Sequence, residues 1–426
     1  MLRHLYSLAL ILAIPFMLLR LLLKSLSIRG YRENIGQRFG KINLPEAGVE
    51  GAPKIWIHAV SVGETIAAAP LVRALLNLQP RPVIVFTTTT PTGADRARAL
   101  FRDSVIHSYS PYDLGFVTRR FLSRVKPDLL IIMETELWPN MLHYCQQAGV
   151  KVLLANGRLS EKSATGYGKV SGLTRRMLQQ IDHIAAQADA DAQRFKALGA
   201  LPENMTVTGS LKFHLEDAAD KPSLPPLFES IKGAGRPVIM AASTRDGEEE
   251  KVLSGIVPLL QYAPAPLLLL VPRHPERFDK VEQLCLDKGL KVQRRSSAET
   301  LNPDTQVLLG DSMGEMLAYY SLADIAFVGG SLVDTGCQNV LEPAALALPV
   351  VVGPSQYNFA TICSQLQAAG ALKTVPDSAA LTQAVGELLE NEEARIAMGR
   401  AGRAVVEQNQ QALPLLIERI AALLAN

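Results

Sequence analysis

The sequence predicts an α/β protein built from two doubly wound domains, each a parallel sheet with helices on both faces. Short apolar runs alternate with amphipathic helical runs on both sides of a polar, proline-rich stretch at 217–226, and this alternation favours a doubly wound fold. Continuous apolar runs such as residues 129–132 are typical of strands buried on both faces. The chain has 426 residues, whereas a single core rarely exceeds about 250–300 residues. We therefore expect two domains with a crevice between them.

Charge and cysteine usage exclude several classes of protein. The net charge is only +2, which argues against a bulk nucleic-acid binder. The four cysteines are scattered and form no CxxC pair, a pattern that fits a reducing cytoplasm and no cysteine zinc site. His and Asp residues show no metal-ligand spacing either. The residues thus predict neither a metal site nor a nucleic-acid partner.

Residues 1–28 are predicted to form a membrane-anchor helix. The segment Leu5–Leu23 is mostly apolar, broken by Pro15 and Arg20, and basic residues rather than a small-residue cleavage site follow it. An uncleaved anchor therefore fits better than a secretory signal. The helix either spans the bilayer once or lies in its interface, and the sequence leaves both open. The basic residues place the rest of the chain on the cytoplasmic side; they are either plain topogenic charge or a site that attracts an anionic lipid.

The first domain is expected at 29–216, with strands and helices alternating. Expected strands are 54–59, 83–88, 104–109, 128–133, 151–155 and 183–187. Expected helices are 64–78, 92–101, 116–125, 139–148, 168–180 and 188–198. In such a sheet the turns that follow the strands meet at the carboxyl edge, where ligands bind.

Glu64 is the most informative residue of the first domain. The turn Ser61–Glu64 joins the first strand to the first helix, and Gly63 allows the chain to pass close to a ligand. Glu64 fits a capping box with Ser61, and it also fits a general base that projects into the crevice. The helix dipole is expected to lower the pKa of Glu64 and keep it ionised. The two roles can coexist.

Other turns of the first domain carry polar side chains, and each of them has a functional and a purely structural interpretation. Glu134, Glu136 and Trp138 follow one strand; two acids beside a Trp resemble a sugar platform, while solvated loop charges are the alternative. Arg158 and Lys212 follow later strands, and each either holds a phosphate or is an ordinary surface cation.

A linker at 217–234, a second domain at 235–408 and a helix at 409–426 complete the predicted organisation. Expected strands of the second domain are 237–242, 266–271, 292–294, 307–309, 325–328, 349–352 and 372–375. Expected helices include 248–260, 276–288, 313–321, 340–347 and 361–369, with a helical end over 391–424.

Three strand-to-helix turns of the second domain resemble phosphate sites. One combines Gly329–Ser331 with a helix that opens at 339–342, the second is 311–315, and the third is 271–275. Glycines permit close backbone approach, and free N–H groups at a helix start favour an anion. Arg273 suits a phosphate or a base, and Glu342 suits ribose hydroxyls. Each turn alone is a weak signal, but together they predict nucleotide binding.

Several long motifs, in this order over essentially the whole chain, resemble the 3-deoxy-D-manno-octulosonic acid (Kdo) transferases of lipid A synthesis. They are residues 61–65 (SVGET), 133–140 (METELWPN), 209–213 (GSLKF), 271–278 (VPRHPERF), 311–315 (DSMGE), 327–331 (FVGGS) and 339–342 (NVLE). The sequence departs from the family pattern at Val340, where Pro is expected, and in the stretch 335–338. Both departures concern loop detail.

The resemblance implies a GT-B glycosyltransferase that moves Kdo from CMP-Kdo to the tetraacyl lipid A precursor, lipid IVA, at the cytoplasmic face of the inner membrane. The donor would bind mainly to the second domain and the acceptor to the first. No metal or cofactor is implied. By resemblance, Glu64 is the catalytic base, and Glu134 and Lys212 assist the transition state. The implied CMP-binding residues are Pro272, Arg273, Met313, Gly314, Glu315, Asn339, Val340, Leu341 and Glu342.

Two other functions stay open at this point. One is a different GT-B nucleotide-sugar enzyme of the epimerase type, although a soluble substrate needs no membrane anchor. The other is a membrane-attached, non-catalytic nucleotide-binding scaffold, although such a protein would not need Glu64. The number of Kdo residues transferred, the acceptor-binding residues and the oligomeric state are not readable from the sequence.

Overall fold

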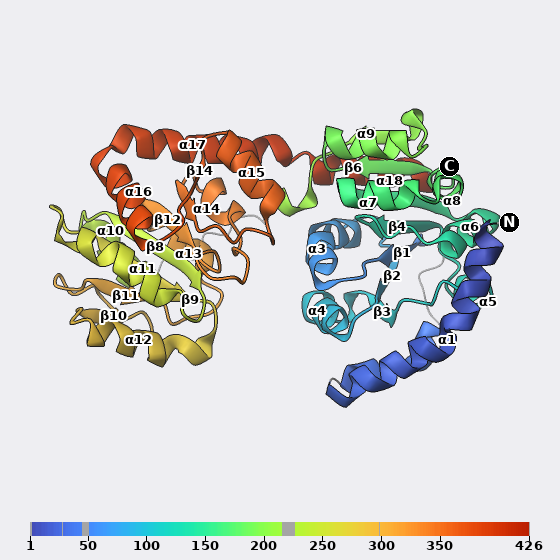
Figure 1. Ribbon diagram of the computed structural model, residues 1–426, viewed down its shortest axis with the longest axis horizontal. Coiled ribbons are helices and arrows are strands. Elements are labelled where there is room, and N and C mark those ends of the chain that lie inside the picture. Colours follow the sequence, from blue (N-terminus) through green and yellow to red (C-terminus); the bar gives the residue numbers. More distant parts are fainter. Residues whose placement is uncertain (1, 28, 45–50, 215–225, 298, 426) are drawn as a thin grey trace. The chain divides into compact units, whose positions relative to one another are not determined.

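The computed structural model describes residues 2–27, 29–44, 51–214, 226–297 and 299–425. By its contacts the chain divides into two compact units (Figure 1). The first unit comprises Met1–His214 together with Asn409–Asn426, and the second comprises Leu215–Gln408.

The first unit contains a seven-stranded parallel sheet in the order β3-β2-β1-β4-β5-β6-β7. The strands are β1 (Lys54–His58), β2 (Val83–Thr88), β3 (Ile106–Tyr109), β4 (Leu129–Met133), β5 (Lys151–Gly157), β6 (His183–Ala186) and β7 (Met205–Val207). The chain moves outward from β1 to β3 and then returns to place β4 beside β1. The order of the sheet therefore reverses between β1 and β4, which is where doubly wound folds bind ligands.

Alternating residues of the central strand pack into two cores, one on each face of the sheet. Ile55 and Ile57 belong to one core and Trp56 to the other, and all three are fully buried. This two-sided burial explains the continuous apolar runs in the sequence. The helices are α1 (Leu2–Ser27), α2 (Ile35–Arg38), α3 (Val62–Leu76), α4 (Pro91–Phe101), α5 (Gly115–Val125), α6 (Pro139–Gln147), α7 (Glu161–Gly168), α8 (Ser171–Leu178), α9 (Asp189–Ala197) and α18 (Ala412–Leu424).

The last helix of the chain, α18, packs in the first unit. Leu413, Leu416 and Ile420 are buried in the same core as Ile55 and Ile57. Figure 1 shows α18 beside the green helices and strands of this unit. The chain therefore returns to the first unit after it has completed the second.

The second unit repeats the architecture with a parallel sheet in the order β10-β11-β9-β8-β12-β13-β14. Its strands are β8 (Val238–Thr244), β9 (Leu267–Pro272), β10 (Val292–Arg294), β11 (Val307–Leu309), β12 (Ile325–Val328), β13 (Val350–Val352) and β14 (Leu372–Thr374). Its helices are α10 (Pro226–Gly233), α11 (Glu249–Ile256), α12 (Phe278–Asp287), α13 (Met316–Tyr320), α14 (Leu341–Ala345), α15 (Ala360–Ala368), α16 (Ser378–Glu390) and α17 (Glu392–Asn409). The order of the sheet reverses between β8 and β12, which are paired.

Four short elements, β7, α7, α8 and α10, differ from the expectation. Strand β7 and helix α7 were not predicted, and the segment expected as one helix over 168–180 forms the shorter α8 after the end of α7. Within the predicted linker 217–234, residues 226–233 form α10, which buries Leu227, Phe228 and Ile231. Pro226 begins this helix, a position where proline is favoured because its missing N–H is not needed. The part of the linker at 217–225 lies outside the described residues.

Candidate active site

Glu64 lies in the first turn of α3, just after β1, and its carboxylate closes a reciprocal cap. The backbone N–H of Glu64 donates to the Ser61 hydroxyl at 3.3 Å, and that hydroxyl donates to Oε1 of Glu64 at 2.8 Å. The backbone N–H of Val60 donates to Oε2 at 2.7 Å. The N-cap expected at Ser61 is therefore present, but the Glu64 carboxylate accepts the N–H of Val60 and not that of Ser61, as a standard capping box would have it. These bonds also fix the carboxylate in one orientation at the carboxyl edge of the sheet.

The pKa of Glu64 is raised to about 7, which corrects the expectation that the helix dipole lowers it. Burial is the main cause, since only 7% of the residue is exposed. The hydrogen bonds from Val60 and Ser61 act in the opposite direction, whereas the charges of Glu136 and Glu134 raise the pKa further. Desolvation thus outweighs the dipole. A carboxylate with a pKa near 7 suits a general base that works at neutral pH.

Two more carboxylates follow the neighbouring strand β4. Glu134 has φ +56°, a backbone conformation that costs energy in a residue with a side chain and is common at functional sites. Glu136 accepts a hydrogen bond from Nε1 of Trp138 at 3.1 Å, and burial raises its pKa. Because both carboxylates act electrostatically on Glu64, the structure brings Glu64, Glu134 and Glu136 together at the reversal between β1 and β4.

His58 packs against Trp138, which donates a hydrogen bond to Glu136, and it was not identified from the sequence. It is the last residue of β1, is fully buried, and its Nδ1 lies 3.0 Å from the Thr87 hydroxyl. Burial lowers the pKa of His58 to about 3, so its imidazole is neutral. The Trp138 ring packs edge-on against this imidazole with centroids 4.8 Å apart. No local sequence signal separates such a support from an ordinary strand residue.

Lys212 lies in a short 3-10 turn, Leu211–Phe213, which Asn156 holds in place. Asn156, the residue before the last of β5, has φ +55° and is fully buried, and its Oδ1 accepts the backbone N–H of Leu211 at 3.0 Å. Asn156 is a positioning residue that the sequence analysis missed. The signal was an Asn-Gly pair at a strand end, because Asn tolerates the left-handed backbone conformation. Arg158, which was considered as a phosphate ligand, directly follows β5 and is exposed.

In the second unit, the turns after β9 and β12 converge on Glu342. Asn339 Nδ2 donates to Oε1 of Glu342 at 3.0 Å, and Asn339 Oδ1 accepts the backbone N–H of Leu341 at 3.0 Å. Burial raises the pKa of Glu342, and the charge of Arg273 opposes this. Arg273 is exposed and directly follows Pro272, the last residue of β9. Val340 is buried beside this cluster.

The turn after β11 places Met313, Gly314 and Glu315 at the same edge, because β11 pairs with β9. Met313 is 57% exposed. Gly314 has φ +86°, a conformation that glycine adopts without strain. The Glu315 carboxylate is paired with Arg295 at 2.9 Å and is also hydrogen-bonded to the Ser312 hydroxyl.

The glycine-rich turn after β12 differs from the expected phosphate site. Its backbone N–H groups are occupied by the buried carboxylate of Glu248, whose Oε1 accepts the N–H groups of Ser331 and Leu332, both at 2.9 Å. Oε2 accepts the N–H of Gly330 at 2.6 Å. The N–H groups that were expected to bind a phosphate are therefore satisfied by a side chain of the protein.

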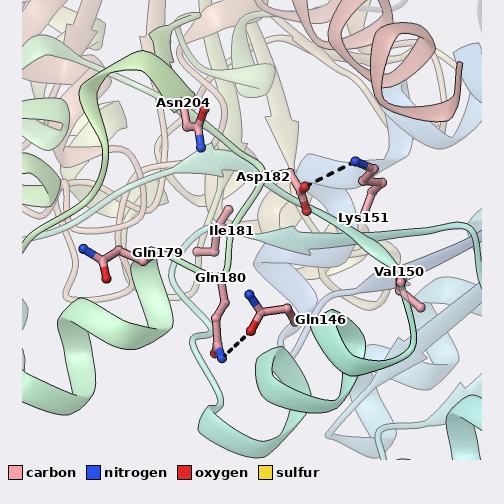
Figure 2. A pocket seen from close by; sticks show the side chains of 9 residues that line it. Gln146, Val150, Lys151, Gln179, Gln180, Ile181, Asp182 and Asn204 are labelled. Carbon is pink, nitrogen blue, oxygen red and sulfur yellow. Dashed lines mark hydrogen bonds and ion pairs between the residues drawn. The ribbon is translucent and has the colours of Figure 1, made fainter. Parts of the chain in front are cut away.

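A separate hollow of the first unit lies at the opposite, amino edge of the sheet (Figure 2). Gln146 and Gln180 are hydrogen-bonded there at 2.9 Å. Lys151, which begins β5, pairs with Asp182 at 3.7 Å, just before β6. The hollow contains none of the candidate site residues. Across the described residues, no three His, Cys, Asp or Glu side chains are grouped as metal ligands.

Comparison with known proteins assigns the family. A family described as 3-deoxy-D-manno-octulosonic-acid transferase matches residues 33–215, and one described as glycosyl transferases group 1 matches residues 287–405. A 3-deoxy-D-manno-octulosonic acid transferase of Haemophilus influenzae is 42% identical over 98% of this chain and 97% of its own length. The enzyme of the same name from Bordetella pertussis is 40% identical over 86% of each chain.

A solved structure confirms the fold. The UDP-GlcNAc 2-epimerase from Neisseria meningitidis, bound to UDP-GlcNAc, aligns with 87% of this chain and 100% of its own, with a TM-score of 0.57 and 15% identity. At this identity the likeness concerns only the fold, which is GT-B-like in having two parallel α/β sheets. The relationship in sequence is to the transferases. The chain therefore belongs to the 3-deoxy-D-manno-octulosonic acid transferase family of glycosyltransferases, and its activity is Kdo transfer in lipopolysaccharide biosynthesis.

Proposed function

We propose that this chain transfers Kdo from CMP-Kdo to lipid IVA without a metal ion, with Glu64 as the general base. The observation that carries this proposal is the environment of Glu64. Its carboxylate is buried, oriented by two hydrogen bonds and raised in pKa to about 7 beside Glu134 and Glu136. A base of this kind is positioned to accept a proton from a hydroxyl and is half-ionised near neutral pH.

In the proposed reaction, Glu64 takes the proton of an acceptor hydroxyl while that oxygen forms a bond to the anomeric carbon of Kdo. The bond between Kdo and the CMP phosphate breaks, and its electron pair leaves with CMP. The carboxylate of Glu134 stabilises positive charge at the anomeric carbon. Lys212 and Arg273 stabilise negative charge on the phosphate, so side chains supply the charge complementarity that the transition state requires.

We assign donor binding to the second unit. Arg273 and Glu342 interact across the turns after β9 and β12, which supports contacts to the phosphate and the ribose respectively. The turn after β11 adds the exposed Met313 and the positive-φ Gly314. The proposed CMP-binding set is Pro272, Arg273, Met313, Gly314, Glu315, Asn339, Val340, Leu341 and Glu342. The N–H groups of Gly330–Leu332 are not included, because Glu248 occupies them.

We assign the lipid acceptor to the first unit and place the enzyme at the cytoplasmic face of the inner membrane. Helix α1, which belongs to this unit, is apolar and long enough to cross a bilayer. Basic residues follow it, in the position that keeps the following chain in the cytoplasm. An anchor on the same unit as Glu64 would hold the base close to a membrane-bound acceptor.

The test is a transfer assay in detergent with CMP-Kdo, lipid IVA and EDTA, read by mass spectrometry. Wild type should add Kdo, and the mass of the product gives the number of residues added. Glu64→Gln should add Kdo roughly 10²–10⁴-fold more slowly while it still binds CMP in calorimetry, and the exposed control Glu203→Gln should behave as wild type. No product even with magnesium would refute the donor or acceptor assignment. A product only with magnesium would refute metal independence.

A further inference from the structure

Helix α1 has two different faces along its whole length. The positions of lower exposure recur along one side of the helix: Arg3, Tyr6, Ser7, Leu10, Ala13, Ile14, Met17, Leu18, Leu21 and Ser25. The opposite face is an apolar stripe whose members are all exposed: Leu2, Leu5, Leu8, Leu12, Phe16, Leu19, Leu23 and Leu26. Ser25 is the one buried residue among positions 2–26, so most of α1 is open to its surroundings, and one side of it presents large apolar side chains.

The beginning of α1 is fixed to buried polar groups of the first unit. Arg3 Nη1 donates to Oδ1 of Asn140 at 2.8 Å, and Asn140 Nδ2 donates to the Ser7 hydroxyl at 3.0 Å. The Tyr6 hydroxyl is hydrogen-bonded to Asp113. Asn140 is fully buried, and Asp113 is 6% exposed. These partners are themselves rigid, because Asp113 accepts the backbone N–H of Asn140 at 2.9 Å.

The far end of α1 is fixed to the same unit. Ser25 is buried, and the Lys24 ammonium lies 5.2 Å from the centre of the Tyr31 ring. The carbonyl of Gly30 then accepts the Tyr109 hydroxyl at 3.2 Å, at the end of β3. Figure 1 shows the dark-blue helix running alongside the first unit from its N-terminal end near α6.

These attachments conflict with a membrane-spanning helix. A spanning α1 would carry one of its ends across a hydrocarbon core of about 30 Å. The contacts keep both ends on the same folded unit, which is not inside the membrane. A helix of 26 residues is about 39 Å long, so it can lie along the unit over this distance. The exposed stripe would then enter the outer part of the bilayer.

We infer that α1 lies in the plane of the membrane interface and inserts its stripe of leucines and Phe16 into a phospholipid surface, while its N-terminus stays on the side of the folded units. Arg20 and Lys24 are exposed beside the stripe, where they can reach anionic headgroups. The inference deepens the membrane location proposed above and rests on it. The surface that covers the stripe is a bilayer that contains anionic lipid.

The test measures depth along the stripe. Single variants Leu5→Cys, Leu12→Cys, Leu19→Cys and Leu26→Cys of the full chain are labelled with a nitroxide and bound to vesicles of phosphatidylethanolamine and phosphatidylglycerol. The four native cysteines are buried, so the introduced thiol is the reactive one. Power saturation with oxygen and with a nickel chelate gives the depth of each label. Glu250→Cys, exposed in the second unit, is the aqueous control.

An interfacial helix places all four labels at a similar, shallow depth, because they occupy one face. A depth profile that is greatest at Leu12 and Leu19 and falls to water at Leu5 and Leu26 would overturn the inference while leaving membrane association intact. Failure of the wild-type chain to float with the vesicles would overturn both. The transfer assay in detergent depends on neither result, so failure of the proposed chemistry would be recognised separately.

A second pair of variants tests the attachment itself. Arg3→Ala combined with Ser7→Ala removes the hydrogen bonds of both side chains to Asn140. In detergent, the nitroxide at Leu5→Cys should become more mobile, and the nitroxide at Leu26→Cys should change little. Equal mobility at Leu5→Cys with and without these substitutions would contradict the attachment.

Discussion

Glu64 caps helix α3 and is the general base of the proposed reaction, and the charges of neighbouring residues shift its pKa. Because the charges of Glu136 and Glu134 raise its pKa, removing one of them should make Glu64 a stronger acid. Wild-type kcat should rise with pH through about 7 as Glu64 loses its proton. In Glu136→Gln this rise should move to lower pH, and the shift is read from kcat–pH profiles of both enzymes.

The control for this experiment is Glu203→Gln, an exposed carboxylate outside the site, which should leave the profile unchanged. Glu64→Gln should lower kcat by roughly 10²–10⁴-fold, the usual contribution of a positioned base. An unshifted profile in Glu136→Gln would show that another group controls the rise.

The raised pKa of Glu64 also has a cost in stability at high pH. Between about pH 4.5 and 7 the folded state holds a proton that the unfolded state has released, so the stability that the protonated carboxyl supplies is lost as pH rises. Glu64→Gln avoids this loss and keeps an acceptor for the Val60 N–H. Its free energy of unfolding, relative to wild type, should increase by on the order of 3 kcal/mol from pH 5 to pH 8. Urea unfolding at both pH values measures it, and a constant difference would contradict the raised pKa.

At the residue scale, the sequence identified the cap and the candidate base but not their electrostatics. The Ser61–Glu64 spacing is local, so the cap could be predicted. The direction of the pKa shift could not, because it depends on burial and on the charges of Glu134 and Glu136, which lie in the turn after another strand. His58 and Asn156 were missed for the same reason: their partners are distant in sequence.

At the scale of elements, the β12 turn depends on Glu248. This carboxylate accepts the N–H groups of three successive residues, Gly330–Leu332. Removing it leaves buried donors unpaired, so Glu248→Ala should destabilise the second unit by about 2–5 kcal/mol. Glu250→Ala, two residues later and exposed, is the control and should be close to neutral. Amide exchange in β12 and β8 measures the effect, and equal protection in both variants would contradict it.

The turn that carries Lys212 depends on Asn156 in a similar way. Asn156→Gly keeps the left-handed backbone conformation and removes only the side chain that accepts the Leu211 N–H. We expect kcat to fall about tenfold, the equivalent of one hydrogen bond, while CMP binding stays as in wild type. Asn204→Gly, in an exposed turn before β7, is the control. Unchanged kcat in Asn156→Gly would show that Asn156 does not position Lys212.

Strands were easier to predict than short helices. Buried parallel strands are continuous apolar runs, and β2, β10, β11 and β12 have the expected bounds. Strand β7 has three residues, of which two are exposed, so it has no apolar run to recognise. Helix α7 buries no residue, so it has no apolar face to recognise. Helix α10 follows a proline-rich stretch that is typical of a linker.

At the scale of the whole molecule, the first unit contains residues from both ends of the sequence. Leu416 of α18 is fully buried with the β1 core, whereas Leu415 beside it is 40% exposed. Leu416→Ala should therefore destabilise the first unit by about 2–5 kcal/mol, and Leu415→Ala should have a small effect. Amide exchange in β1 is the measurement. Equal protection of β1 in the two variants would show that α18 contributes little to this core.

The return of α18 to the first unit has a consequence for how the chain is made. Residues up to His214 leave the ribosome with one flank of their core uncovered, because the helix that covers it is synthesised only after the whole second unit. The second unit is continuous in sequence and can complete its core during synthesis. The unit that carries Glu64 is thus begun before the second unit and completed after it, and a polypeptide released before α18 would expose apolar surface where this helix should lie.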